Sequence, residues 1–292
     1  MKNTLFILLS FLLISCYDRE AKVSNKELTG QDFRLFQGTP VWALAKAVED
    51  EDSITLKKII LKERPNLNYK ELKFGNTLLM LAVVNNKYDS AKILLNAGAS
   101  PNTPNNYRGT TAMIDAAGND DPKYLKLLLS HGGNPNALES APARENDAAR
   151  STPLNTAISL SNINTLEKVE LLVDSGANIN YSNEGNPTYT TLPLADALIH
   201  DKIDVAIYLL GKNADYKKVM YIMVDGHKVY ILEALRKVVV DLDSKEYKNK
   251  LKVIMFLKSK GLDYYKEPIP EYIMKEIKKK YPSNWETFMK EY

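Results

Sequence analysis

The stretch GNTLLMLA at residues 75–82 recurs as GTTAMIDA at residues 109–116, a spacing of 34 residues. The ends of the two units also agree, because LLNAGASPN at 94–102 returns at the same spacing as LLSHGGNPN at 128–136. Self-similarity at a fixed period of this length is typical of proteins built from stacked units, none of which can bury its apolar face alone. The sequence therefore predicts a repeat protein.

These units resemble the ankyrin repeat, which has a period near 33, a start of the form TPLHxA and a leucine pair before a Gly-Ala-Asp type of turn. The resemblance implies a turn followed by two antiparallel helices in each unit. TPLNTA at 152–157 is the best match to the start, and LLVDSGANIN at 171–180 ends that unit. Three additional residues are expected around 161–164, between its two helices.

Three further units are weaker. A fifth runs from LPLADA at 192–197 to LLGKNAD at 209–215, with Asn213 in place of the glycine that would adopt a left-handed backbone. A sixth starts near Tyr230 and ends at Asp263, and its helices are expected to be longer than usual. WALAKA at 42–47 begins a degenerate first unit, which is expected to be the N-terminal cap.

We therefore predict an all-α protein, an ankyrin-repeat solenoid of about six helix-pair repeats with hairpin fingers over residues 38–267. The segment 268–292 is expected to form one or two capping helices, because Ile273, Ile277, Tyr281, Trp285 and Phe288 supply apolar contacts for the last exposed face. Proline disfavours helix at the residue before it, so a break is expected at 282–284.

The first residues contain an apolar run from Leu5 to Ile14, followed by LISC at 13–16. The run is too short to span a bilayer and indicates a secretory signal peptide at 1–15. LISC resembles the bacterial lipobox, which implies lipidation of Cys16, the only cysteine in the chain. The alternatives are a conventional signal peptide and an ordinary buried cysteine.

Several acyl chains on Cys16 would hold the protein on a membrane, since one chain binds only marginally. Residues 16–37 are polar and are expected to form a lipidated tether. The expected location is the bacterial cell envelope, on the periplasmic side. The outer membrane is favoured because Tyr17, and not aspartate, follows Cys16.

The net charge of +3 is modest, and export from the cytoplasm also disfavours nucleic-acid binding. Residues 245–292 hold twelve lysines and seven acidic residues. This basic region would suit an acidic partner or anionic lipid, although a solvated helical surface explains it as well.

Catalytic and metal-binding motifs are not evident. His131, His200 and His227 lie in different units, and none has a second ligand-type residue at a spacing that indicates zinc. The sequence contains no phosphate-binding loop, nucleophile elbow or glycine-rich dinucleotide turn. We therefore predict a protein that is not an enzyme and has no catalytic residues, metal or cofactor.

The repeat register predicts where a protein partner binds, because partners of ankyrin proteins generally contact the fingers and the exposed side of each first helix. Tyrosine and arginine are also enriched at interface hot spots. Packing of a finger side chain on its neighbour is the alternative for each position. The predicted finger residues are Lys73, Phe74, Asn76, Tyr107, Arg108 and Tyr189, and the predicted first-helix residues are Val84, Asn85, Asn119, Ile199 and His200.

The whole pattern resembles bacterial ankyrin lipoproteins, some of which look like periplasmic immunity proteins that neutralise secreted antibacterial effectors such as lipases. The resemblance implies a protein partner, such as an effector toxin, and a membrane anchor through lipid. The alternative is a scaffolding lipoprotein that binds an endogenous envelope protein.

Overall fold

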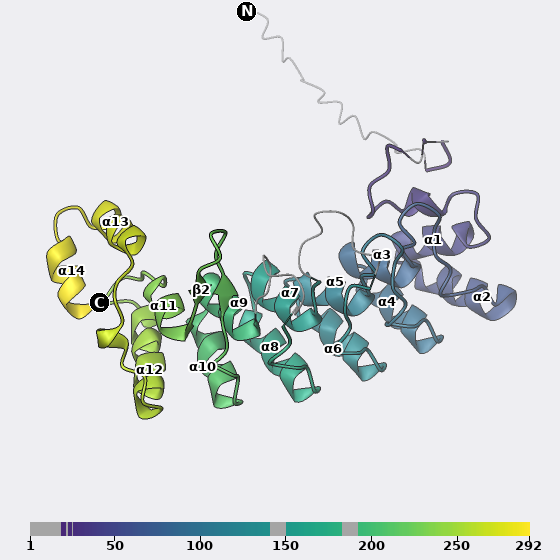
Figure 1. Cartoon of the computed structure of the whole chain (residues 1–292). Helices are drawn as coiled ribbons and strands as arrows, with labels where there is room; N and C mark the ends of the chain where they lie inside the picture. The colour runs from purple at the N-terminus through teal and green to yellow at the C-terminus, as the bar shows by residue number, and fades with distance from the viewer. Residues whose placement is uncertain (1–18, 22, 25, 141–149, 183–191) are drawn as a thin grey trace, which may run out of the picture.

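The computed structural model describes residues 19–292 except 22, 25, 141–149 and 183–191. Within these described ranges, six antiparallel helix pairs stack side by side in one row, and two further helices follow them (Figure 1). The first helices of the pairs are α1 (Trp42–Glu49), α3 (Leu78–Val84), α5 (Ala112–Gly118), α7 (Pro153–Leu160), α9 (Pro193–Ile199) and α11 (Ile231–Arg236). The second helices are α2 (Ser53–Glu63), α4 (Tyr88–Asn96), α6 (Lys123–Ser130), α8 (Thr165–Asp174), α10 (Ile203–Gly211) and α12 (Lys245–Ser259). The helix-pair solenoid expected from the sequence is confirmed.

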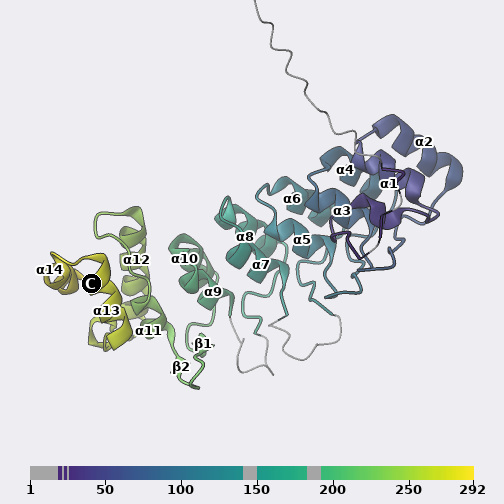
Figure 2. The ribbon, with the colours of Figure 1, turned by 90° about the horizontal axis from the view of Figure 1, so that it is seen from above.

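The pairs stack in two layers, since each first helix packs on neighbouring first helices and each second helix on neighbouring second helices. The parts of the connecting fingers that the structure describes project beside the first-helix layer (Figure 2). The finger between the fifth and sixth pairs contains two short antiparallel strands, β1 (Tyr221–Ile222) and β2 (Lys228–Val229). The first helices and the fingers therefore share one side of the molecule.

Small side chains allow the first helices to lie close together. Ala82, Ala116, Ala157 and Ala197 occupy the same place in four successive repeats, and all four are fully buried. The leucines and isoleucines around them form one continuous core that runs through all six pairs. Because every pair buries its apolar face against the next, stability is distributed along the row.

The helix ends follow the repeat motif. The Thr77 and Thr152 hydroxyls each accept a main-chain N–H from the third residue after them, which caps α3 and α7. After the second helices, Gly98 has a φ of 98° and Asn213 a φ of 66°, as expected for left-handed positions. The fourth unit has its three additional residues, since α7 and α8 with their turn span residues 153–174, against 78–96 for α3 and α4. They are not all between the helices as expected, because α7, the turn and α8 are each one residue longer.

The sixth pair differs from expectation. Only its second helix is long, with 15 residues in α12, whereas α11 has six. After α11 the chain runs through residues 237–244 without helix, and its buried Val238 packs into the core. The expectation of two long helices was therefore wrong for α11.

Part of the segment expected to be a tether is packed on the first pair. The 3-10 helix η1 (Phe33–Phe36) contacts α1, and Leu28, Phe33 and Phe36 are buried in the main core. Burial of these side chains removes apolar surface from water and fixes the segment in place. Residues 28–36 thus extend the N-terminal end of the stack.

The last two helices are α13 (Glu271–Lys280) and α14 (Trp285–Glu291), and Pro282 lies between them as expected. The 3-10 helix η2 (Tyr264–Lys266) precedes them. Their apolar side chains form a small second cluster around Ile273, Ile277 and Phe288. The helices therefore enclose a core of their own in addition to following the last repeat.

Cations and aromatic rings join this cluster to the sixth pair. The Arg236 guanidinium lies 3.8 Å from the centre of the Tyr264 ring and donates to the main-chain oxygens of Tyr264 and Tyr292 at 2.8 and 2.9 Å. Lys250 lies 3.7 Å from the centre of the Tyr292 ring and donates to the Val238 carbonyl. The joint at the C-terminal end is therefore polar as well as apolar.

Candidate protein-binding surface

Two polar side chains, the buried Glu71 and the half-buried Asn105, shape the fingers that lead into the second and third repeats. In the first of these fingers, the Glu71 carboxylate accepts main-chain N–H groups from Lys73, Phe74 and Asn76 at 2.6 to 2.9 Å. In the next finger, the Asn105 side-chain oxygen accepts four N–H groups from residues 107–110. These bonds hold each fingertip in one conformation, so the outward side chains are pre-organised.

The two fingers lie directly against each other. The Asn106 N–H donates to the Phe74 carbonyl at 2.8 Å, and the Phe74 and Tyr107 rings meet edge to face at 5.9 Å between centres. Gly75 makes this approach possible, because its φ is 74° and an added Cβ would lie 2.6 Å from the Asn106 nitrogen. The fingers therefore form one continuous surface.

A hollow of about 310 Å³ lies between these fingers and the helices α3 and α5. Its volume is at the low end of the range for small-ligand sites, about 300 to 1,000 Å³. Apolar and aromatic side chains make up much of its lining, and a few polar groups converge on it. The lining residues are Gly30, Gln31, Phe74, Asn76, Met80, Leu81, Val84, Asn105, Tyr107, Thr110 and Asp115.

Four of the residues predicted as partner contacts meet in this hollow: Phe74, Asn76, Val84 and Tyr107. Asn76 differs from the others, since it is buried and its side chain donates to the Gly30 carbonyl and accepts from Asn105. It therefore helps to build the hollow. Tyr107 remains 47% exposed and is the most accessible ring at the rim for a partner to contact.

Four other predicted residues hold neighbouring segments in place. Lys73 and Asn85 donate to main-chain carbonyls of the N-terminal segment, Lys73 to those of residues 26 and 28 and Asn85 to that of residue 31. Arg108 forms a two-point ion pair with Glu139, at 2.8 and 2.9 Å. Asn119 donates to the Asn86 side chain at 3.0 Å. None of these four residues lines the hollow.

The remaining predicted residues do not belong to this hollow. Ile199 and His200 lie at the end of α9, in the fifth pair, and both side chains are exposed. Tyr189 and Cys16 lie outside the described residues. Partner binding by any of these residues stays a prediction.

Asp115 was missed by the sequence reasoning. It lies on α5, is partly buried and lines the hollow. Burial, together with the like charge of Glu139, raises the pKa of Asp115 to about 7. Asp115 occupies the variable position x of the TPLHxA motif. The preceding repeat has Leu81 at that position, and later repeats have Thr156 and Asp196. A carboxylate at that position was the available signal.

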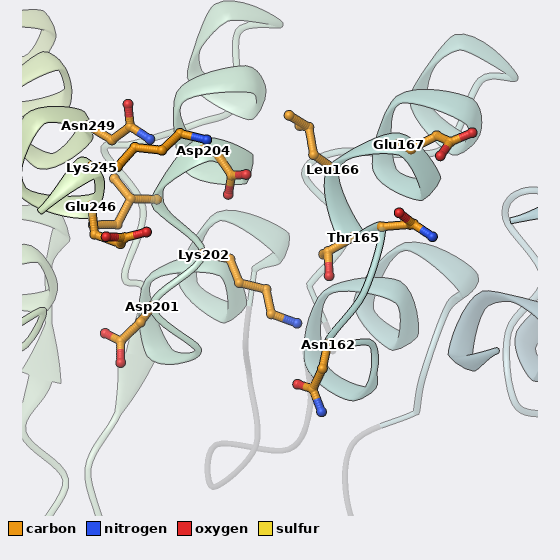
Figure 3. Close-up of a pocket in the computed structure, with 12 residues that line it drawn as sticks. Asn162, Thr165, Leu166, Glu167, Asp201, Lys202, Asp204, Lys245, Glu246 and Asn249 are labelled. Carbon is orange, nitrogen blue, oxygen red and sulfur yellow. The ribbon is translucent and has the colours of Figure 1, made fainter. Parts of the chain in front are cut away.

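A second hollow of about 430 Å³ lies at the opposite ends of the first helices, beside the turns within the fourth to sixth pairs. Its lining is polar and includes Asn162, Asp201, Lys202 and Lys245 (Figure 3). Lys202 extends toward the turn of the fourth pair and donates to the carbonyls of Ile158 and Ser161. No residue predicted as a partner contact lines it.

Within the described parts of the chain, no cluster of three or more His, Cys, Asp or Glu side chains could hold a metal ion. The helices assigned there include none with the length and apolar character of a membrane span.

Comparison with known proteins identifies the repeats. Residues 44–139 match the family model for ankyrin repeats in three copies. A putative ankyrin repeat-containing protein of Treponema pallidum is 33% identical over 99 residues, which are 34% of this chain and 32% of that protein. Inversin of Gallus gallus is 38% identical over 101 residues, which are 34% of this chain and 9% of inversin.

The chain spans about a third or less of the length of these relatives. Residues 44–139 are thus ankyrin repeats, and the stacked helix pairs over the rest of the row are consistent with an ankyrin solenoid. Ankyrin repeats generally mediate protein–protein interaction. No catalytic family is indicated.

Proposed function

We propose that this protein is a membrane-anchored ankyrin-repeat protein that binds another protein at the hollow between the fingers of its second and third repeats. More specifically, we propose that it is an immunity protein, which neutralises a secreted antibacterial effector such as a lipase in the periplasm. One observation carries it: Phe74, Val84 and Tyr107, which come from two adjacent repeats, line one hollow.

The physical character of this surface favours a protein ligand. Its lining is mainly apolar with a few polar groups, and Tyr107 belongs to a residue type enriched at interface hot spots. The internal hydrogen bonds of Glu71 and Asn105 fix both fingertips. A partner that binds here would order few additional side chains, which favours affinity.

The proposed anchor would keep this surface near a membrane. If Cys16 carries lipid, the 14 residues from Cys16 to Gly30 span at most about 50 Å when extended. Since Gly30 lines the hollow, a partner bound there would lie within that reach of the lipid surface. This placement suits an effector that attacks lipids.

To test the partner, the full chain is mixed with the product of a neighbouring toxin gene, and complex formation and toxin activity are measured. The expected result is a stoichiometric complex that abolishes the toxin's activity. Phe74→Ala and Tyr107→Ala are each expected to weaken it by more than about 1 kcal/mol. Tyr265→Ala is the matched control, because Tyr265 is 56% exposed and does not line the hollow.

Two results would count against the immunity proposal. Recovery of only an envelope-assembly protein from native membranes, with no toxin protected, would favour the scaffolding function. Turnover of a substrate by the purified chain would contradict both.

The anchor is tested separately by labelling cells with a fatty acid. Cys16→Ser is expected to abolish labelling and to move the protein out of the membrane fraction, because the apolar run of the signal is too short to remain as a membrane span. Equal labelling of the wild type and the variant would rule out lipidation at Cys16.

A further inference from the structure

Carboxylates near the fingers differ in how well they are paired. Glu71 accepts three main-chain N–H groups, and Glu139 accepts from Arg108, Thr110 and the Ser151 N–H. At the motif position equivalent to Asp115, Asp196 accepts from the Asn155 amide at 2.7 Å. Asp115 itself forms no hydrogen bond or ion pair with any residue that the structure describes.

Two cations of these fingers form their bonds with other groups. Arg108 is paired with Glu139, and the Lys73 ammonium donates to two carbonyls of the N-terminal segment while it lies 4.8 Å from the centre of the Phe74 ring. Glu139 adds a like charge near Asp115 and no compensation. A partly buried carboxylate without a cation is costly unless a ligand supplies one.

The walls of the hollow specify what kind of cation fits. Phe74 and Tyr107 present aromatic rings, and Met80, Leu81 and Val84 supply apolar surface. A guanidinium is planar, stacks on aromatic faces and matches a carboxylate with two parallel hydrogen bonds. Its three-carbon stem is apolar and suits the remaining wall.

We propose that the hollow binds an arginine side chain of the protein partner, with its guanidinium paired to Asp115 and its stem between Phe74, Tyr107 and Val84. This proposal deepens the protein binding described above and rests on it for the source of the arginine. It makes Asp115 the residue that selects the partner by charge.

The direct test uses Nα-acetyl-arginine N-methylamide as the probe and the full chain in detergent, with methyl groups labelled for NMR. The expected result is a saturable shift of the Met80, Leu81 and Val84 methyl signals, with weak affinity because a single side chain makes few contacts. The corresponding citrulline amide has nearly the same shape and no charge, and it is expected to cause no saturable shift.

Variants separate the ion pair from packing. Asp115→Asn keeps the shape of the side chain and is expected to raise the Kd of the arginine probe about tenfold or more. Asp89→Asn removes the same charge from an exposed position on α4 and is expected to leave the Kd unchanged. Phe74→Leu retains apolar volume and is expected to weaken binding through loss of the ring.

Three results would overturn the proposal: no saturable shift with the arginine probe, equal binding of the citrulline probe, or unchanged binding by Asp115→Asn. Because the probe is one amino acid, such a failure leaves a protein complex at the fingers intact. Failure to find an effector partner, in turn, does not alter the probe result.

Discussion

Charged side chains at the hollow between the fingers differ in their hydrogen bonding from those at the opposite edge, which the turns within the helix pairs form and which we call the turn edge. At the turn edge, Lys168 donates to the carbonyls of Ala117 and Asn119, and Lys202 donates to those of Ile158 and Ser161 one repeat further on. Each lysine thus ties the end of a first helix to the next repeat. Asp115 has no comparable partner among the described residues.

The difference indicates a division of roles along the same stack. Charged groups whose hydrogen bonds are satisfied within the chain hold repeats together. A carboxylate left without a partner in an apolar hollow contributes nothing comparable to stability and remains available to a ligand. Changes at the two places should therefore have effects of opposite sign on folding.

The largest effect is expected at the turn edge. Lys168→Ala removes a fully buried side chain and leaves two carbonyls without their donor, so the free energy of unfolding is expected to fall by about 3 kcal/mol. Chemical denaturation measures it. Lys123→Ala, which removes an exposed ion pair with Asp121, is the control and should change little. Equal effects of the two changes would show that the turn edge does not join the repeats.

A smaller loss is expected where α4 ends and the second finger begins. Gly98 has a φ of 98°, so Gly98→Ala is expected to lower the free energy of unfolding by about 1 to 2 kcal/mol. Gly211 lies within α10 with open space around it, and Gly211→Ala is expected to stabilise the protein slightly. Thermal melts in which Gly98→Ala is more stable than Gly211→Ala would show that the assigned repeat register is wrong.

The smallest effect is expected at the hollow, where a substitution should raise the free energy of unfolding. The folded-state pKa of Asp115 is about 7, above the ordinary value of aspartate, so the protonated form is favoured by folding. The contribution of the protonated carboxyl to the free energy of unfolding is complete below about pH 4 and is lost as pH rises through 7. Asp115→Asn is therefore expected to be more stable than wild type at pH 8, by about 1 kcal/mol or more, with the difference shrinking toward pH 4. Denaturation at both pH values measures it, and a less stable variant at pH 8 would indicate a structural role for the carboxylate.

Much of the repeat architecture could be predicted from local chemistry. Left-handed positions at Gly98 and Asn213 and the hydroxyl cap of Thr152 follow from short-range rules. The same register placed Phe74, Val84 and Tyr107 on one side of the molecule, although it did not show that they line a common hollow.

What the sequence did not reveal depends on contacts between distant segments. Phe33 and Phe36 lie in a short 3-10 helix without a periodic pattern, so their burial on α1 was not evident. The burial of Arg236 and Lys250 follows from aromatic rings far along the chain. Asp115 occupies a motif position that accepts many residue types, and only the geometry shows that none of the described residues pairs with it.

Titration of the Asp115 carboxyl carbon by NMR, with and without saturating arginine probe, tests the central claim most directly. Glu139 is the charged group that acts on Asp115 in the free protein, and Arg108 already pairs with Glu139. We expect the pKa of Asp115 to be about 7 in the free protein and to fall by about one or more with the probe, because a nearby cation favours the ionised form. A pKa near the ordinary aspartate value in the free protein, or one that the probe does not change, would contradict the account.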